Sequence, residues 1–297
     1  MPRCPMALRT TLRYLREFGR NVRLYGIPRA ARLGSAKVLR LIAGSPLIRP
    51  LISPSVSDVL KSSNNISTSA THALAKFFPE TDETLLKQWA NEYDDSIADQ
   101  FMQSESSEIH SLYPTEWAVA QESAFFLHLL VRLRRPSLVV ETGVANGLSS
   151  TSILLALAKN GHGCLVSIDV DENVGSLVPE ILRNRWHLEV LPKDRSQREA
   201  LVDIFNSLGP VDIFLHDSDH SYDWQTFEYE VARSHLAPEG LILSDDIDWS
   251  FAFIDFCQTY QSRPSYLISS GKIFGVACNG KDMKLNRVGE HHERTDH

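Results

Sequence analysis

Short apolar runs alternate with longer amphipathic stretches over the second half of the chain. Seven runs have the length and β-branched composition of buried strands, at residues 137–141, 165–169, 188–191, 211–216, 241–244, 265–269 and 272–278. Stretches with helical periodicity separate most of them, at 149–160, 176–184, 195–208, 223–234 and 251–260. This alternation is typical of βαβ units. We therefore predict an α/β fold whose seven-stranded, mainly parallel sheet is closed by an antiparallel C-terminal hairpin.

The residues before this unit have a helical pattern. Residues 71–135 predict helices over 83–102 and 115–135, the second ending before Pro136, and they are interpreted as a cap that shapes a substrate site. Residues 51–70, rich in Ser, Asn and Pro, indicate a linker that follows basic helices in residues 1–50. The expected organisation is a helical arm and linker at 1–70, a cap at 71–135, the α/β domain at 136–280 and a polar tail at 281–297.

Charge is distributed unevenly. Residues 1–50 contain eleven Lys and Arg residues and one acid, about +10, so a chain of net charge −7 carries about −17 elsewhere. An acidic body argues against nucleic acid as the partner. The basic arm is expected either to pack on the main domain or to contact a membrane peripherally.

Localisation is predicted from cysteine spacing and from the N-terminus. The four cysteines lack paired spacing, which favours a reducing compartment and a cytoplasmic protein, with a place at a membrane surface left open. No apolar run reaches the roughly 20 residues of a membrane span. Arginines interrupt the N-terminal apolar stretches, which argues against a secretory signal. The Arg-rich, acid-poor composition also resembles that of an organellar transit peptide.

A glycine-containing loop follows the first predicted strand. In the segment from Glu141 to Gly147, Gly143 allows a sharp turn out of the strand, and Gly147 allows the next helix to approach a ligand. That helix begins near Ser149, where backbone N–H groups are expected to point into a crevice at the carboxyl edge of the sheet.

Acids follow the next two strands. Asp169 stands where a carboxylate can accept the hydroxyls of a ribose, and Asp194 stands within reach of an adenine edge. The alternatives are glycines that serve packing alone, or a dinucleotide site, which would have Gly-x-Gly-x-x-Gly in place of the Gly-x-x-x-Gly found here.

The strings VVETGVANGLSS, LVSIDVD, FLHDSDHSY and APEGLILSDDI, in that order, resemble class I S-adenosylmethionine-dependent methyltransferases. The resemblance covers residues 115–280 and is narrowest to the branch related to cephalosporin-hydroxylase-like proteins and catechol-type O-methyltransferases. It implies a Rossmann-like methyltransferase sheet binding S-adenosylmethionine, with Glu141 and Gly143 at its amino-acid part and Asp169 at its ribose. Ala145 departs from the family, which usually has glycine there. Homo-oligomers, common among related enzymes, are left open.

Two further strand ends carry acids, in His216-Asp-Ser-Asp-His220 and in Ser244-Asp-Asp246. Converging carboxylates repel one another unless a cation or proton neutralises them, and oxygen ligands favour Mg²⁺ or another hard divalent cation. In the metal-dependent O-methyltransferases that the chain resembles, the matching ligand positions are Asp217, Asp245 and Asp246. His220 is the candidate general base, because the ordinary pKa of imidazole is about 6.5.

The sequence therefore predicts an S-adenosylmethionine-dependent O-methyltransferase that acts, with a divalent metal, on a hydroxyl of a small molecule or glycan. Asp217 and His220 are its expected catalytic residues, and Asp217 also borders the cofactor. Two alternatives stay open: a metal-independent methyltransferase with His220 as its base, and a non-catalytic S-adenosylmethionine-binding protein of the same fold. Nothing in the chain identifies the acceptor further.

Overall fold

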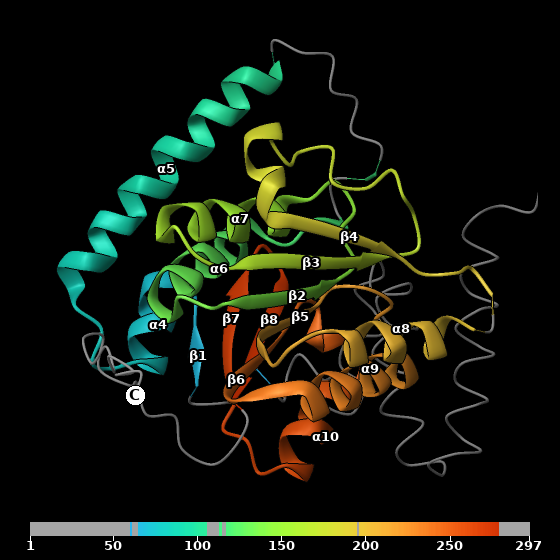
Figure 1. Ribbon diagram of the computed structural model, residues 1–297. Helices are drawn as coiled ribbons and strands as arrows, with labels where there is room; N and C mark the ends of the chain where they lie inside the picture. Colours follow the sequence, from blue (N-terminus) through green and yellow to red (C-terminus); the bar gives the residue numbers. More distant parts are fainter. Residues whose placement is uncertain (1–59, 61–64, 106–112, 115–116, 195, 279–297) are drawn as a thin grey trace, which may run out of the picture.

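The computed structural model describes residues 60, 65–105, 113–114, 117–194 and 196–278 (Figure 1). The basic arm expected at 1–50 and the polar tail expected at 281–297 lie outside the described residues. Within the ranges that are described, no helix combines the length and the apolar character needed to cross a membrane.

One eight-stranded sheet runs through the molecule. Its strands are β1 (Ile66–Ser67), β2 (Leu138–Thr142), β3 (Cys164–Asp169), β4 (Trp186–Val190), β5 (Val211–His216), β6 (Leu236–Ser244), β7 (Ser265–Ser269) and β8 (Lys272–Cys278). They lie in the order β1-β7-β8-β6-β5-β2-β3-β4, and only β8 runs antiparallel to its neighbours. The predicted Rossmann-like sheet with its C-terminal hairpin is confirmed. The additional strand β1 pairs with β7, in a segment expected to be a linker.

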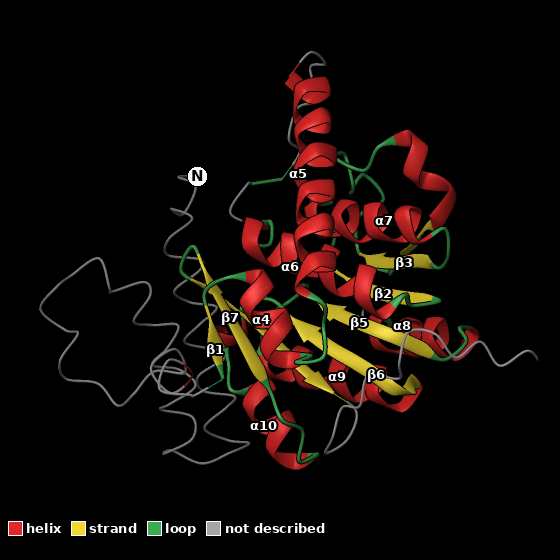
Figure 2. Ribbon diagram, turned by 90° about the vertical axis from the view of Figure 1, so that its left-hand side faces the viewer, coloured by secondary structure: helices red, strands yellow, loops and turns green. Residues whose placement is uncertain are grey.

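Helices cover both faces of the sheet (Figures 1 and 2). They are α4 (Ala70–Phe77), α5 (Glu83–Glu105), α6 (Gln121–Arg134), α7 (Leu148–Asn160), α8 (Gln197–Ser207), α9 (Tyr222–His235) and α10 (Ala252–Thr259), with the short 3₁₀ helices η3 (Glu180–Arg185) and η4 (Ile247–Trp249).

Two predicted helices differ from the observed elements. The helix expected at 115–135 begins only at Gln121, because Trp117 closes a turn onto the carbonyl of Pro114 (3.0 Å) and Ala120 has an extended backbone. The helix expected at 176–184 is replaced by η3, which begins after the extended Pro179.

Alternate residues of each central strand point to opposite faces of the sheet and fill two separate cores. Val139, Ile213 and Leu215 pack with α4, α6 and α7, whereas Val140 and Phe214 pack with α8, α9 and α10. The helices of the expected cap thus share a core with the sheet. That they shape a substrate site stays a prediction.

The sheet positions the site through its topology. From β2 the chain proceeds outward through β3 to β4, then returns to β5 on the other side of β2 and proceeds outward to β6. The carboxyl ends of β2 and β5 are therefore the switch point at which ligands bind in open α/β sheets. Every expected site residue follows β2, β3, β4, β5 or β6, or ends one of those strands.

Candidate functional site

The loop after β2 touches the loop after β5. Gly143 has a positive φ of 81°, and its N–H donates to the carbonyl of Ile168 (2.9 Å). A Cβ at Gly143 would lie 2.2 Å from the carbonyl oxygen of Asp217, which no side chain tolerates. The N–H of Asp217 in turn donates to the carbonyl of Thr142 (2.8 Å). Glycine is therefore required here, and its absence of a side chain brings the acidic segment beside the glycine loop.

Gly147 makes a close contact with the loop after β3. It precedes α7 with a φ of 89°, and a Cβ there would lie 2.9 Å from Cα of Gly175 and 3.1 Å from a methyl of Val178. The loop after β3 thus already requires glycine here, and the expected approach of a ligand at Gly147 stays a prediction. Ala145 also has a positive φ (48°), at the position where the resembled family has glycine, and its carbonyl accepts from the N–H of Gly175 (2.9 Å).

Glu141 lies beneath this loop, not in it. Its carboxylate is fully buried and accepts hydrogen bonds from three hydroxyls, those of Ser150, Ser167 (2.5 Å) and Ser149 (3.1 Å). Burial raises the pKa of Glu141 to about 7, and the three hydroxyls oppose that rise. The side chains of Glu141 and Ser149 are both buried, and the contact expected between Glu141 and a cofactor stays a prediction. Both side chains fasten the start of α7 to the sheet.

Asp169 ends β3 and is partly exposed beside the glycine loop. One of its oxygen atoms accepts from the N–H of Val144 (2.8 Å), and the other accepts from the N–H of Val170 (2.7 Å). Asp169 therefore ties the loop after β2 to the loop after β3, and its expected contact with a ribose stays a prediction.

Asp194 is exposed and accepts from both the N–H (2.9 Å) and the hydroxyl (2.6 Å) of Ser196, just before α8. These two bonds lower its pKa. Its expected contact with adenine stays a prediction.

The acidic residues after β5 and β6 converge. Nε2 of His220 lies 3.9 Å from a carboxylate oxygen of Asp217 and 3.7 Å from one of Asp246. Asp245 is fully buried, and its N–H donates to the carbonyl of His216 (2.9 Å). The structure therefore brings together the four side chains predicted for catalysis or for a metal, those of Asp217, His220, Asp245 and Asp246. Asp245 is buried, and the other three side chains are 9% to 18% exposed.

A residue that the sequence reasoning missed completes this group. Nζ of Lys272 lies 3.0 Å from Oδ2 of Asp245 and 3.3 Å from Oδ2 of Asp246. The signal was available in principle: Lys272 begins the strand predicted at 272–278, and an antiparallel return beside β6 brings its start to the end of β6. We call Asp217, Asp245, Asp246 and Lys272 the acidic cluster.

The electrostatics of the acidic cluster follow from burial. Desolvation, followed by repulsion from Asp245, raises the pKa of Asp217 well above its ordinary value. Desolvation and Asp246 raise the pKa of Asp245 to about 7, although Lys272 opposes this. For Lys272, burial acts to lower the pKa, but the three carboxylates outweigh it and the net pKa is raised. The ammonium is therefore held in its charged form.

The expected divalent-cation site is not found in this arrangement. No group of three or more His, Cys, Asp or Glu side chains within the described ranges is placed to hold a metal ion. The physical reason at Asp217, Asp245 and Asp246 is Lys272, whose ammonium occupies the space between two of the three carboxylates. As arranged, these residues do not fit Mg²⁺.

A buried network supports the acidic segment from below. Glu228 of α9 accepts hydrogen bonds from Nδ1 of His216 (2.5 Å), the hydroxyl of Thr142 (2.6 Å) and Nε1 of Trp224 (2.5 Å). The His216 ring packs at 5.4 Å from the ring of His220. Glu228 thus links the ends of β2 and β5 to α9 and fixes the residue against which His220 rests.

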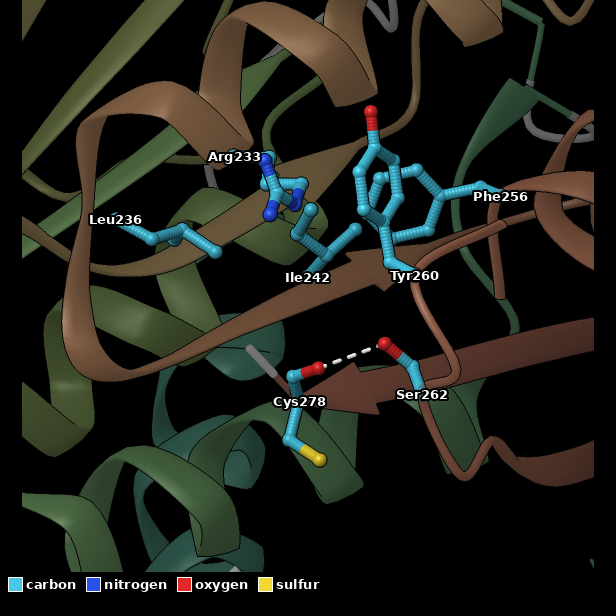
Figure 3. A pocket seen from close by; sticks show the side chains of 7 residues that line it. All are labelled: Arg233, Leu236, Ile242, Phe256, Tyr260, Ser262 and Cys278. Atoms are coloured by element: carbon cyan, nitrogen blue, oxygen red, sulfur yellow. Dashed lines mark hydrogen bonds between the residues drawn. The ribbon is translucent and has the colours of Figure 1, made fainter. Parts of the chain in front are cut away.

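The pocket in Figure 3 lies elsewhere. It is bordered by the end of α9, the start of β6, α10 and the end of β8, and none of its lining residues belongs to the acidic cluster. The Arg233 guanidinium stacks 3.8 Å from the centre of the Tyr260 ring, and the hydroxyl of Ser262 donates to the carbonyl of Cys278 (2.9 Å). These are packing contacts, and none of the residues that line this pocket belongs to the site described above.

Comparison with protein families bears on the same segment. Residues 140–247 match the model of a family described as a methyltransferase domain. The match begins in β2 and ends after β6, so it contains the glycine loop, Asp169 and the acid-bearing ends of β5 and β6. This segment of the chain is therefore similar to a methyltransferase domain. Lys272 lies outside the matched segment.

Solved methyltransferases are among the structures similar to this chain. One is an O-methyltransferase from Bacillus cereus in complex with SAH, at 12% identity and a TM-score of 0.47, covering 71% of this chain and 97% of that chain. Another is the O-methyltransferase TomG from Streptomyces achromogenes, involved in tomaymycin synthesis and in complex with SAM, at 16% identity, 68% and 92% coverage and a TM-score of 0.46. No curated protein matches the chain.

Proposed function

We propose that this chain binds S-adenosylmethionine and transfers its methyl group to a hydroxyl of a small molecule or glycan. The observation that carries the proposal is the contact between Gly143 and Asp217, which joins a glycine loop to a carboxylate and imidazole cluster at the switch point of the sheet. A cofactor loop and a proton acceptor are thus adjacent in the segment that matches the methyltransferase family.

The residues at this edge fit the proposed cofactor by their chemistry. Gly143, Ala145 and Asp169 are all partly exposed. The first two present little more than backbone, and the third presents a carboxylate, which suits ribose hydroxyls. The neighbouring carboxylates suit a ligand that carries a positively charged sulfur and an ammonium group. Glu141 supports this surface from beneath, since it anchors the serines at the start of α7.

Proton removal from the acceptor is assigned to His220. Bound S-adenosylmethionine supplies an electrophilic methyl group on a sulfonium. The methyl group would come from S-adenosylmethionine held at Gly143, Ala145 and Asp169, and His220 would take the proton of the acceptor hydroxyl. Asp217 and Asp246 stabilise the imidazolium, because their oxygen atoms lie 3.9 and 3.7 Å from Nε2. Lys272 in the acidic cluster favours this base-only route over the metal-assisted one.

Calorimetric titration tests the cofactor assignment. The full chain should bind S-adenosylmethionine and S-adenosylhomocysteine and not NAD⁺, and Asp169→Asn should weaken binding by about tenfold or more, the loss of one good hydrogen-bond acceptor. Asp203→Asn, on the exposed face of α8, is the matched control and should bind as the wild type does. No heat of binding at millimolar S-adenosylmethionine would refute the proposal.

Turnover tests the base. With methyl-labelled S-adenosylmethionine and panels of phenols, sugars and hydroxylated small molecules, the wild type should form a labelled O-methyl product. His220→Ala should lower the rate by about 10² to 10⁴ while leaving the Kd for S-adenosylmethionine unchanged. Cofactor binding without product from any acceptor, in wild type and variant alike, would favour the non-catalytic alternative.

A further inference from the structure

Lys272 is positioned by the fold and is not a mobile surface side chain. Ser270 and Gly271 form a two-residue hairpin turn in which both have positive φ (52° and 81°), so β8 begins at Lys272 opposite Ser269. Gly275 pairs with Ser244 of β6 in the antiparallel ladder. The start of β8 therefore projects beyond the end of β6, where Asp245 and Asp246 follow. The Lys272 side chain is only 19% exposed there.

The acidic cluster depends on that ammonium. The side chain of Asp245 is fully buried, and its Oδ1 accepts no hydrogen bond from the residues that the structure describes. Its Oδ2 receives the ammonium of Lys272 at 3.0 Å. A buried carboxylate that loses its partner is strongly destabilising, because the desolvation cost then goes uncompensated. Lys272 is thus the main compensation for Asp245.

A second cation bound to the Oδ2 atoms of Asp245 and Asp246 would lie close to the ammonium of Lys272. A divalent ion bound by carboxylates lies about 2.0–2.6 Å from their oxygen atoms, inside the space that Nζ of Lys272 now faces. An ammonium held at 3.0 Å and 3.3 Å from Asp245 and Asp246 would repel it. Binding of a metal ion to these two Oδ2 atoms therefore requires Lys272 to leave them.

We propose that Lys272 takes the place of a divalent cation in this protein, neutralising Asp245 and Asp246 so that the acidic cluster holds no metal. Lys272 is then a positioning residue: it keeps Asp246 and, through it, His220 in place. The inference concerns the cluster itself, and its test is independent of whether methyl transfer is the reaction.

Mn²⁺ titration of the full chain, followed by the electron paramagnetic resonance of the free ion, tests the proposal. The wild type should show no saturable binding up to about 1 mM, the weak end of the range of built carboxylate sites for Ca²⁺. Lys272→Met should bind one Mn²⁺ at least about tenfold more tightly, because the carboxylates are left with no other cation. Lys87→Met, which removes an exposed lysine of α5, should behave as the wild type does.

Thermal unfolding gives a second readout. Lys272→Met should unfold at a lower temperature than the wild type, Mn²⁺ should restore part of the loss, and Lys272→Arg, which keeps the charge, should lose less. If Lys272→Met does not fold, Lys272→Met combined with Asp245→Asn removes one charge of each sign and should recover folded protein.

Three outcomes would overturn the proposal. The first is micromolar Mn²⁺ binding by the wild type that Asp245→Asn abolishes. The second is a Lys272→Met protein as stable as the wild type, and the third is one that Mn²⁺ does not stabilise.

Discussion

Glu141 makes the stability of this protein depend on pH in a direction opposite to that of most carboxylates. Its carboxyl group is fully buried beneath α7, and burial raises its pKa to about 7 from an ordinary 4.5. Between these two values the folded protein holds a proton on Glu141 that the unfolded chain releases. The contribution of protonated Glu141 to the stability of the fold is therefore complete below about pH 4.5, and it is lost as the pH rises through about 7.

The magnitude follows from the two pKa values. Each pKa unit corresponds to about 1.4 kcal/mol, so raising the pH from about 5 to about 8 should remove about 2.5 kcal/mol of unfolding free energy through Glu141 alone. Glu141→Gln keeps the shape of the side chain and an acceptor for the serine hydroxyls, but it cannot ionise. The free energy of unfolding of the variant, relative to that of the wild type, should therefore rise by about 2.5 kcal/mol over the same pH range.

Urea unfolding of both proteins at several pH values measures this difference. Other titrating groups are common to the two proteins and cancel when the free energies of unfolding are subtracted. Glu172→Gln, which removes an exposed carboxylate from the loop after β3, controls for the loss of one negative charge near the same edge. Parallel stability curves for the wild type and Glu141→Gln would refute the reasoning.

Three further predictions rest on other features. Ala145→Gly should stabilise the fold by up to about 1 kcal/mol in urea unfolding, because glycine relieves the positive φ of 48°; a loss of stability would contradict this. Glu228→Ala should destabilise it by about 3 kcal/mol or more, since buried donors on Thr142, His216 and Trp224 lose their acceptor; a change below about 1 kcal/mol would count against the network. Alanine at the arginines of residues 13–23 should reduce co-sedimentation with anionic but not neutral vesicles, and equal binding would retire the membrane contact.

The strands could be predicted from the sequence because burial on both faces leaves a plain apolar signature. The strand expected at 211–216 and the hairpin strands expected at 265–269 and 272–278 have the observed bounds. The two residues of β1 could not be found, since such a short edge strand has no periodicity and exists only through its pairing with β7. The late start of α6 depends on a turn onto Pro114, which local helix propensity does not report.

For the site, strand ends were predictable and side-chain contacts were not. That Asp169, Asp217 and Asp245 gather at one edge follows from parallel strands alone. That Glu141 turns inward to three serines, and that Gly147 makes room for Gly175, depends on how the loops pack on one another. Residue type and spacing in the sequence do not indicate either of these contacts.

The acidic cluster shows that side-chain contacts also decide how the carboxylates are neutralised. Carboxylates after β5 and β6 can neutralise one another through a metal, a shared proton or an ammonium, and the acids themselves do not decide among the three. Here the deciding residue lies 27 positions after Asp245, on the strand that returns antiparallel to β6. In a sheet of this order, the first residue of that returning strand faces the acids at the end of β6. A lysine at that position therefore predicts that the protein itself neutralises the charge of these acids. An uncharged residue there predicts that a bound cation or a proton neutralises them.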